Sequence, residues 1–228
     1  INLLANWAAM RIDAGDFEGS EALALTALER ARAEPAVALD TRASIWSSVA
    51  TARDGLGRLD EALDAFQRTL ELQRQATGEA HPSYAIVLNN LALLYFSMDR
   101  LDDAIDAMSE SVRIRRETLG DAHPQTATAL FNLARLQTIA GNLDAAERLA
   151  HEALEVARGG YEAGHPRIGK AHEALAIVLR ARGEPAAALR EITTAIEIYR
   201  NAPGIDPAWL EAARTIGDEL VAVLAAES

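Results

Sequence analysis

The sequence predicts an all-α repeat protein in which antiparallel helix pairs stack into an open solenoid. The pair His-Pro occurs three times, and each copy begins 42 residues after the last, at His81, His123 and His165. A fixed period of this length is typical of helix-pair repeats, in which each repeat contacts only its neighbours. The period therefore predicts the architecture, and copy number determines the length of the chain.

Five further sets of positions keep the same period, and we call each set a column. The first column holds a small residue in all five copies: Ala8, Ala50, Ala92, Ala134 and Ala176. Larger apolar residues precede it: Trp7, Val49, Leu91, Leu133 and Leu175. Gly15, Gly57, Asp99, Gly141 and Gly183 follow it. A second small-residue column is Ser20, Ala62, Ala104, Ala146 and Ala188, and an apolar column is Leu28, Leu70, Val112, Leu154 and Ile196.

Each repeat is predicted to contain a helix A, a tight turn, a helix B and an exit loop. In the third copy, Pro82 suits the first helical position, where a missing N–H costs nothing. Apolar residues then recur at helical spacing through Tyr95. Asp99 replaces the usual Gly, and we expect it to end helix A in a left-handed conformation. The small residues face each other where helices A and B approach closely, while Leu70 and its column fill the space between repeats.

The predicted A helices lie near 1–14, 40–55, 82–98, 124–140 and 166–182, and the B helices near 17–33, 59–77, 101–119, 143–159 and 185–201. An eleventh helix is predicted over 207–226 with Asp206 as its N-cap, and we expect it to close one end of the stack. The domain prediction is a single array without an internal boundary, with repeats near 1–39, 40–81, 82–123, 124–165 and 166–206. Because Ile1 aligns with positions inside the other A helices, we interpret the chain as a fragment of a longer protein.

The composition excludes several classes of function. The chain has no cysteine, which rules out disulfides and cysteine-ligated metal sites. Its formal net charge of −12 argues against nucleic acid and against anionic membrane surfaces as partners. No apolar run is long enough to predict a transmembrane helix. We therefore expect a cytoplasmic protein.

These columns resemble those of the tetratricopeptide repeat, in which a large apolar residue, Leu-Ala, Gly and Ala recur at fixed positions. The 42-residue period, with Leu-Gly-Asp-Ala-His-Pro at 119–124 and Leu-Asn-Asn-Leu-Ala at 88–92, is similar to the longer subtype of kinesin light chains. It also resembles arrays in bacterial regulatory proteins, which are fused to kinases, signalling ATPases or caspase-like peptidases. The resemblance covers nearly the whole chain. It implies a right-handed superhelix whose concave surface, lined by A helices, binds peptides or proteins.

The resemblance assigns a ligand-binding role to an Asn column on the A helices. It is occupied by Asn6, Asn90 and Asn132, and interrupted by Ser48 and Ala174. An Asn side chain both donates and accepts, so it can hold a peptide backbone without reading its side chains. The alternative is that each Asn bonds to the neighbouring helix.

Further positions of the third, fourth and fifth copies are predicted on the same concave face. Phe96 and Phe131 would be apolar anchors if exposed, and the alternative, burial against the next helix, applies more to Phe96. In the fifth copy, Lys170 and Arg180 could attract a carboxylate, but the negative charge of Glu173 partly cancels theirs. The remaining candidates are Ile86, Asn89, Leu93, Thr128 and Arg135.

Three other motifs point to chemistry that the sequence does not support. Successive His-Pro pairs should lie roughly 10 Å apart, the spacing of packed helices, which is too far for shared metal ligation, so a role in the loop before helix A is expected. Residues 164–171 approach a phosphate-binding loop but lack its Ser or Thr, and no strand precedes them. No nucleophile–base set is present at a recognisable spacing. We therefore predict no enzymatic activity, metal or cofactor.

The predicted function is a protein-binding module with a regulatory or scaffold role in a larger signalling protein. The partner would be a peptide or protein segment bound on the concave face, mainly across the third and fourth repeats. The alternative is a self-association element that forms a homo-oligomer for a fused effector domain.

Overall fold

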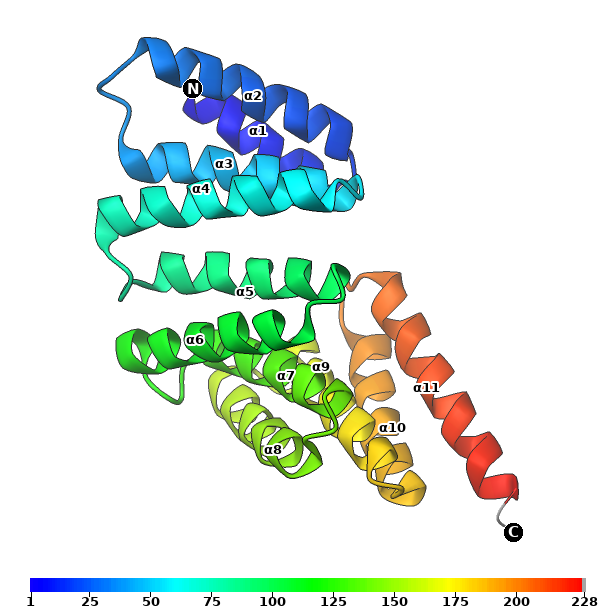
Figure 1. The fold of residues 1–228 in the computed structure, drawn as a ribbon. Coiled ribbons are helices and arrows are strands. Elements are labelled where there is room, and N and C mark those ends of the chain that lie inside the picture. Colours follow the sequence, from blue (N-terminus) through cyan, green and yellow to red (C-terminus); the bar gives the residue numbers. More distant parts are fainter. Residues whose placement is uncertain (227–228) are drawn as a thin grey trace. The chain divides into compact units, whose positions relative to one another are not determined.

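The computed structural model describes residues 1–226, and within this range the chain forms eleven α-helices and no strand (Figure 1). The A helices are α1 (Asn2–Asp13), α3 (Leu39–Gly55), α5 (Pro82–Ser97), α7 (Pro124–Ile139) and α9 (Pro166–Ala181). The B helices are α2 (Phe17–Ala33), α4 (Leu59–Thr77), α6 (Leu101–Leu119), α8 (Leu143–Gly160) and α10 (Pro185–Asn201), followed by α11 (Pro207–Ala226). Every predicted helix boundary falls within one residue of the observed one.

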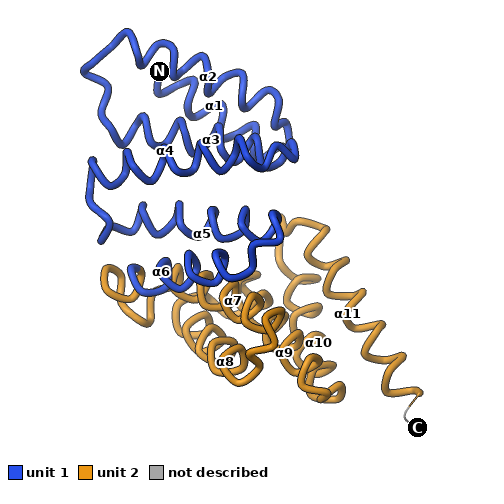
Figure 2. Tube along the Cα trace, in the orientation of Figure 1, with its two compact units in different colours: residues 1–114 blue, residues 115–228 orange. Residues whose placement is uncertain are grey.

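The chain divides into two compact units, residues 1–114 and residue 115 onward (Figure 2). The first unit contains α1 to α5 and most of α6, and the second contains the end of α6 and α7 to α11. Each unit is a series of helix pairs in which consecutive helices pack side by side, as α3 packs on α4 and α9 on α10. The sequence predicts that both units belong to a single continuous array. This depends on how the two units join, so it stays a prediction.

The tight turns between A and B helices have the predicted left-handed backbone. Gly57 and Gly141 have φ angles of 73° and 78°, and Asp99 has a φ of 58° at the equivalent position. Asp99 is the only described non-glycine residue with a positive φ. An aspartate tolerates this conformation better than most residues because its short side chain bonds locally.

The three His-Pro pairs form the N-termini of A helices. In each pair the imidazole Nδ1 accepts a hydrogen bond from the backbone N–H two residues later, at 3.2 Å for His81, 3.2 Å for His123 and 3.1 Å for His165. The following proline occupies the first turn, where no N–H is required. This column is therefore a helix cap, which explains its period without any ligand.

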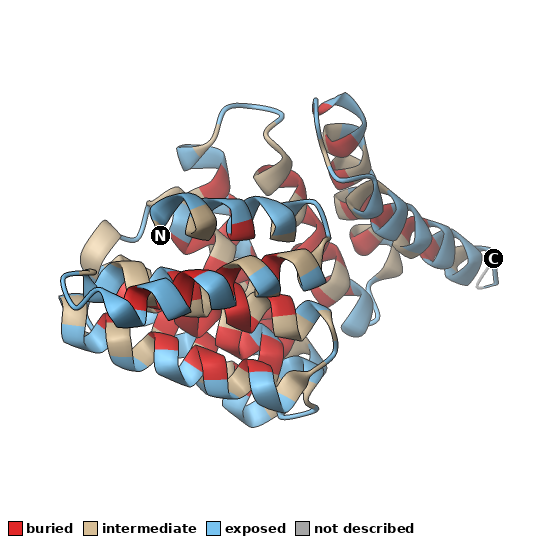
Figure 3. Cartoon of the chain, turned by 90° about the horizontal axis from the view of Figure 1, so that it is seen from above, coloured by how far each residue is buried: buried red, intermediate tan, exposed pale blue. Residues whose placement is uncertain are grey.

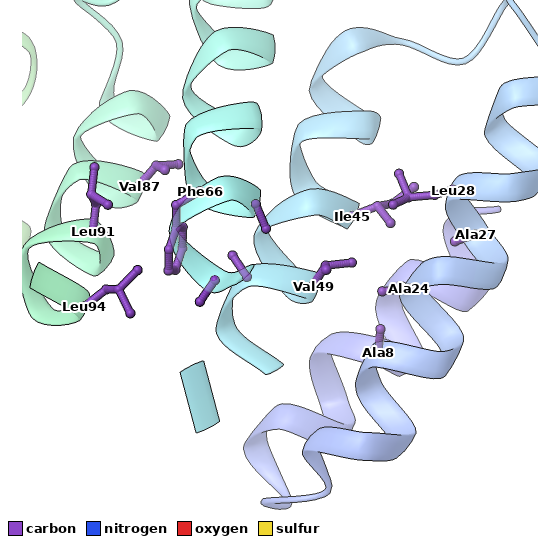
Figure 4. Close-up of a cluster of buried hydrophobic side chains, with 13 residues drawn as sticks. Ala8, Ala24, Ala27, Leu28, Ile45, Val49, Phe66, Val87, Leu91 and Leu94 are labelled. Carbon is purple, nitrogen blue, oxygen red and sulfur yellow. The ribbon is translucent and has the colours of Figure 1, made fainter. Parts of the chain in front are cut away.

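The small-residue columns lie where the sequence places them, at the buried contacts between helices (Figure 3). In the first unit, Figure 4 shows Ala8, Ala24 and Ala27 between α1, α2 and α3, with Leu28 against Ile45. Larger side chains fill the spaces between successive repeats. All ten small-residue positions are fully buried, with no exposed surface: Ala8, Ser20, Ala50, Ala62, Ala92, Ala104, Ala134, Ala146, Ala176 and Ala188.

Helix α11 packs against α10 and buries Ala213, Gly217 and Leu220. Asp206 begins it as predicted, since its Oδ1 accepts from the N–H of Ala208 at 2.9 Å. The helix thus covers apolar surface of α10 in the second unit.

Candidate ligand-binding face

The first unit has a hollow of about 490 Å³ along its A helices. Helix α3 supplies more lining residues than any other helix, and Ser44, Ser47, Ser48 and Thr51 among them recur at helical spacing. Other lining residues come from α1, α4 and α5: Ala9, Ile12, Asp13, Thr69, Gln73, Ser83, Ile86 and Val87, together with Asp40 and Ala43 of α3. The lining is rich in hydroxyl groups and carries two carboxylates.

A polar network joins three helices at one end of this hollow. The Gln73 Nε2 donates to Asp40 Oδ1 at 3.1 Å, and the Ser83 hydroxyl donates to Gln73 Oε1 at 3.0 Å. Gln73 is buried on α4, whereas Asp40 is exposed on α3. The network fixes the orientation of the Asp40 carboxylate and leaves part of its accepting capacity facing solvent.

The Asn column has two members in the first unit. Asn6 is exposed on α1 and Asn90 is half-buried on α5, with Ser48 between them on α3. Asn90 Oδ1 accepts from the Asn89 Nδ2 at 3.3 Å, so these neighbours on α5 interact with each other. Asn89 itself is 9% exposed, which places it at the edge of the core.

Helix α5 also presents an exposed apolar stripe. Ile86, Leu93 and Phe96 are 44%, 41% and 40% exposed, and their spacing puts them on one side of the helix. Phe96 is therefore available as an apolar anchor, although the sequence favoured its burial.

The equivalent residues of α7, in the second unit, differ in exposure. Phe131 is 5% exposed, so it belongs to the core and is not an exposed anchor. Thr128 and Asn132 are half-buried, and Arg135 is exposed. Because Asn90 and Asn132 belong to different units, a ligand held by both stays a prediction.

On α9 the predicted cations are already paired within the second unit. Lys170 Nζ lies 3.0 Å from Glu173 Oε2 and 4.5 Å from the centroid of the Trp209 ring. The Tyr199 hydroxyl donates to Glu173 Oε2 at 2.9 Å. Arg180 pairs with Glu219 of α11. Lys170 and Arg180, which were predicted to attract a carboxylate of a ligand, are thus paired with carboxylates of the chain itself. Lys170 is also the lysine of the run that resembles a phosphate-binding loop.

Burial governs the electrostatics of this cluster. It raises the pKa of Tyr199 far above its usual range, and the Glu173 carboxylate adds to the shift. Tyr199 therefore stays protonated and remains a hydrogen-bond donor.

His172 connects three helices in the second unit. Its Nδ1 lies 2.6 Å from Glu191 Oε2 on α10, and its Nε2 lies 3.2 Å from an Arg158 nitrogen on α8. Arginine can only donate, so Nε2 must accept and the proton must sit on Nδ1. Burial lowers the pKa of His172, although Glu191 opposes the shift. The residue is a neutral structural bridge.

Sequence reasoning missed the hydroxyl-rich lining of the first unit. The signal was present, because Ser44, Ser47, Ser48 and Thr51 are spaced three or four residues apart and therefore share one face of α3. In the family pattern, Ser48 counts only as an interruption of the Asn column. The family pattern predicts ligand-binding residues mainly in the third and fourth repeats. The hollow is lined chiefly by α3, which belongs to the second repeat.

Comparisons with known proteins agree with the fold. A family profile described as tetratricopeptide repeat matches residues 41–117, 85–159 and 138–201. Since these matches span more than half of the chain, the chain belongs to the tetratricopeptide-repeat family. No curated protein sequence matches it significantly.

Solved structures of similar fold include BtubC from P. vanneervenii, with 23% identity over 90% of this chain and 81% of that one and a TM-score of 0.76. A Podosopora anserina protein described as a kinesin light chain has 18% identity over 90% of this chain and 97% of that one, with a TM-score of 0.72. A tetratricopeptide repeat protein from Parabacteroides merdae has 20% identity over 98% of this chain and 73% of that one, with a TM-score of 0.64. The repeat resembles the kinesin-light-chain kind, as the 42-residue period predicted.

Among residues 1–226, no helix combines the length and apolar character needed to cross a membrane.

Proposed function

We propose that the chain is a protein-interaction module that binds an extended segment of a partner in the hollow of its first unit. Repeat arrays of this family generally bind proteins and lack catalysis, which supports a scaffold or regulatory role in a larger protein. The observation that supports this location is the open hollow along α1, α3 and α5, which is lined by hydroxyl groups and two exposed carboxylates and lies beside exposed apolar residues of α5.

The adjacent residues suit an extended chain. Asn6 and Asn90 can donate to and accept from a peptide backbone, while Ile86 and Phe96 offer apolar contact. Their exposure means that binding would bury surface that is now in water.

The test is a titration of the identified partner by calorimetry. Asn90→Ala should weaken binding by about fivefold, and Phe96→Ala by more, because aromatic anchors dominate such interfaces. Ser47→Trp should block binding by filling the hollow.

Arg68→Ala is the control, since Arg68 lies outside this hollow and lines a second one of about 500 Å³ with Trp46. If Arg68→Ala weakens binding while Ser47→Trp and Phe96→Ala do not, the partner uses that other surface.

The second candidate function is self-association through α1, and one observation favours it. Leu3, Trp7 and Met10 are 62%, 51% and 67% exposed on α1. Residues of the same columns on the other A helices, such as Ile45, Val49 and Ala52 of α3, are fully buried. A second copy of the chain would bury the α1 residues in the way that repeat-to-repeat packing buries the others.

Light scattering tests this candidate. It predicts a dimer for the wild type and a monomer for Trp7→Gln. A monomeric wild type at micromolar concentration would exclude it.

A further inference from the structure

Resting on the proposed function, we propose that the hollow of the first unit recognises a positively charged, extended segment, whose Lys or Arg side chains pair with Asp13 and Asp40. The two carboxylates are the only charged groups among the described residues that line this hollow. No lysine or arginine of the described part of the chain shares the lining with them.

The positions of Asp13 and Asp40 define the length of the segment. Asp13 ends α1 and is in the column of Gly55, the last residue of α3, while Asp40 lies in the first turn of α3. The carboxylates therefore lie about 22 Å apart along the helix direction, at 1.5 Å per residue. About seven residues of extended chain would span this distance. The separation also excludes chelation of one metal ion by both groups.

Two buried hydroxyl groups and one buried amide of the hollow already donate to other protein atoms. The Thr69 hydroxyl donates to the Ala65 carbonyl at 2.9 Å, and the Ser48 hydroxyl donates to the Ser44 carbonyl at 3.4 Å. The Gln73 amide is likewise occupied with Asp40. The protons of these two hydroxyl groups are thus used within their own helices, and their oxygen lone pairs remain. A ligand that brings donors fits this lining better than one that brings carboxylates.

Three arginines of the first unit are paired with groups other than these two carboxylates. Arg42 donates to the carbonyls of Ala31 and Glu34 in the loop between α2 and α3, at 2.6 Å and 3.0 Å. Arg53 and Arg58 both pair with Glu21. The charge of −12 over the chain adds long-range attraction for a cationic partner.

The experiment begins with a random peptide library displayed on phage and selected against the chain, with the Ser47→Trp variant used to remove peptides that bind elsewhere. The selected peptides should be enriched in Lys and Arg at two positions about seven residues apart. Enrichment in Asp and Glu, or in apolar residues alone, would overturn the proposed charge preference and leave the hollow as the binding site. Failure to select any peptide that Ser47→Trp excludes would overturn the proposed function as well.

The selected peptide, labelled with fluorescein, is then titrated by anisotropy at physiological salt. Asp13→Asn with Asp40→Asn should weaken binding by about tenfold, because two charged pairs are lost. The matched control is Glu29→Gln with Asp106→Asn, which removes the same charge from exposed positions outside the hollow. Equal weakening by both double variants would show general attraction to an acidic surface and would overturn the proposal. Circular dichroism confirms that each variant remains helical.

Discussion

Helices α3 and α9 occupy the same place in their repeats, and four of their residues fall in the same columns. On α3 these are Ser44, Ser47, Ser48 and Thr51, which line an open hollow. On α9 they are Lys170, Glu173, Ala174 and Ile177. The first two are taken up by contacts with Tyr199 of α10 and Trp209 of α11. The comparison shows that the repeat defines where a face lies, while the column residues determine whether it is available to a partner.

The largest difference is expected when Glu173 and Ser47, which share a column, are each truncated to alanine. Glu173→Ala leaves Lys170 and the Tyr199 hydroxyl without their partner in a buried setting, so we expect a loss of about 3 kcal/mol of unfolding free energy. Ser47→Ala should change it by less than about 0.5 kcal/mol. Urea titration followed by circular dichroism measures both. If both substitutions lowered the unfolding free energy equally, the face of α9 could not be called filled and that of α3 open.

Overpacking should affect both units alike, because the small-residue column is buried in each. Ala92→Leu and Ala134→Leu introduce a larger side chain at fully buried sites and should each cost about 1–3 kcal/mol. Ala222→Leu on the exposed side of α11 is the control and should be neutral. Unchanged denaturation midpoints for the first two variants would show that the helix contact is misplaced.

A smaller effect concerns the pH dependence of the second unit. Because the pKa of His172 is lowered in the folded state, the unfolded chain binds the proton more readily. The stabilisation from His172 is therefore complete above its usual value of 6.5 and is lost as the pH falls below it.

Between pH 7 and pH 5 the wild type should lose on the order of 1 kcal/mol more stability than His172→Gln, whose amide can bond both neighbours without titrating. The His81, His123 and His165 caps are present in both proteins, so the difference isolates His172. Parallel stability curves for the two proteins would rule out this account.

Most of the fold was predictable because it depends on local, repeated information. The 42-residue columns specify which residues are small, apolar or turn-forming, and each helix packs on its sequence neighbours. The structural role of the His-Pro pairs was predicted, whereas the imidazole cap was not, because it depends on a ring orientation.

The candidate site was less predictable, since exposure depends on which neighbours cover a face. Phe131 and Phe96 are both predicted on the concave face, in different columns, and the structure buries the first and exposes the second. The pairing of Lys170 with Glu173 could be predicted from their spacing on α9. Their contacts with Tyr199 of α10 and Trp209 of α11 could not, because these depend on how the helices pack.

The central claim is that α3 presents an open binding face while the matching face of α9 is filled. The most direct measurement is a titration of the isotope-labelled chain with the selected peptide, followed by two-dimensional NMR of the backbone amides. The amide signals of Ser44, Ser47 and Thr51 should move on titration, and those of Lys170, Glu173 and Ile177 should stay in place. Movement of the α9 signals with α3 unchanged would contradict the claim.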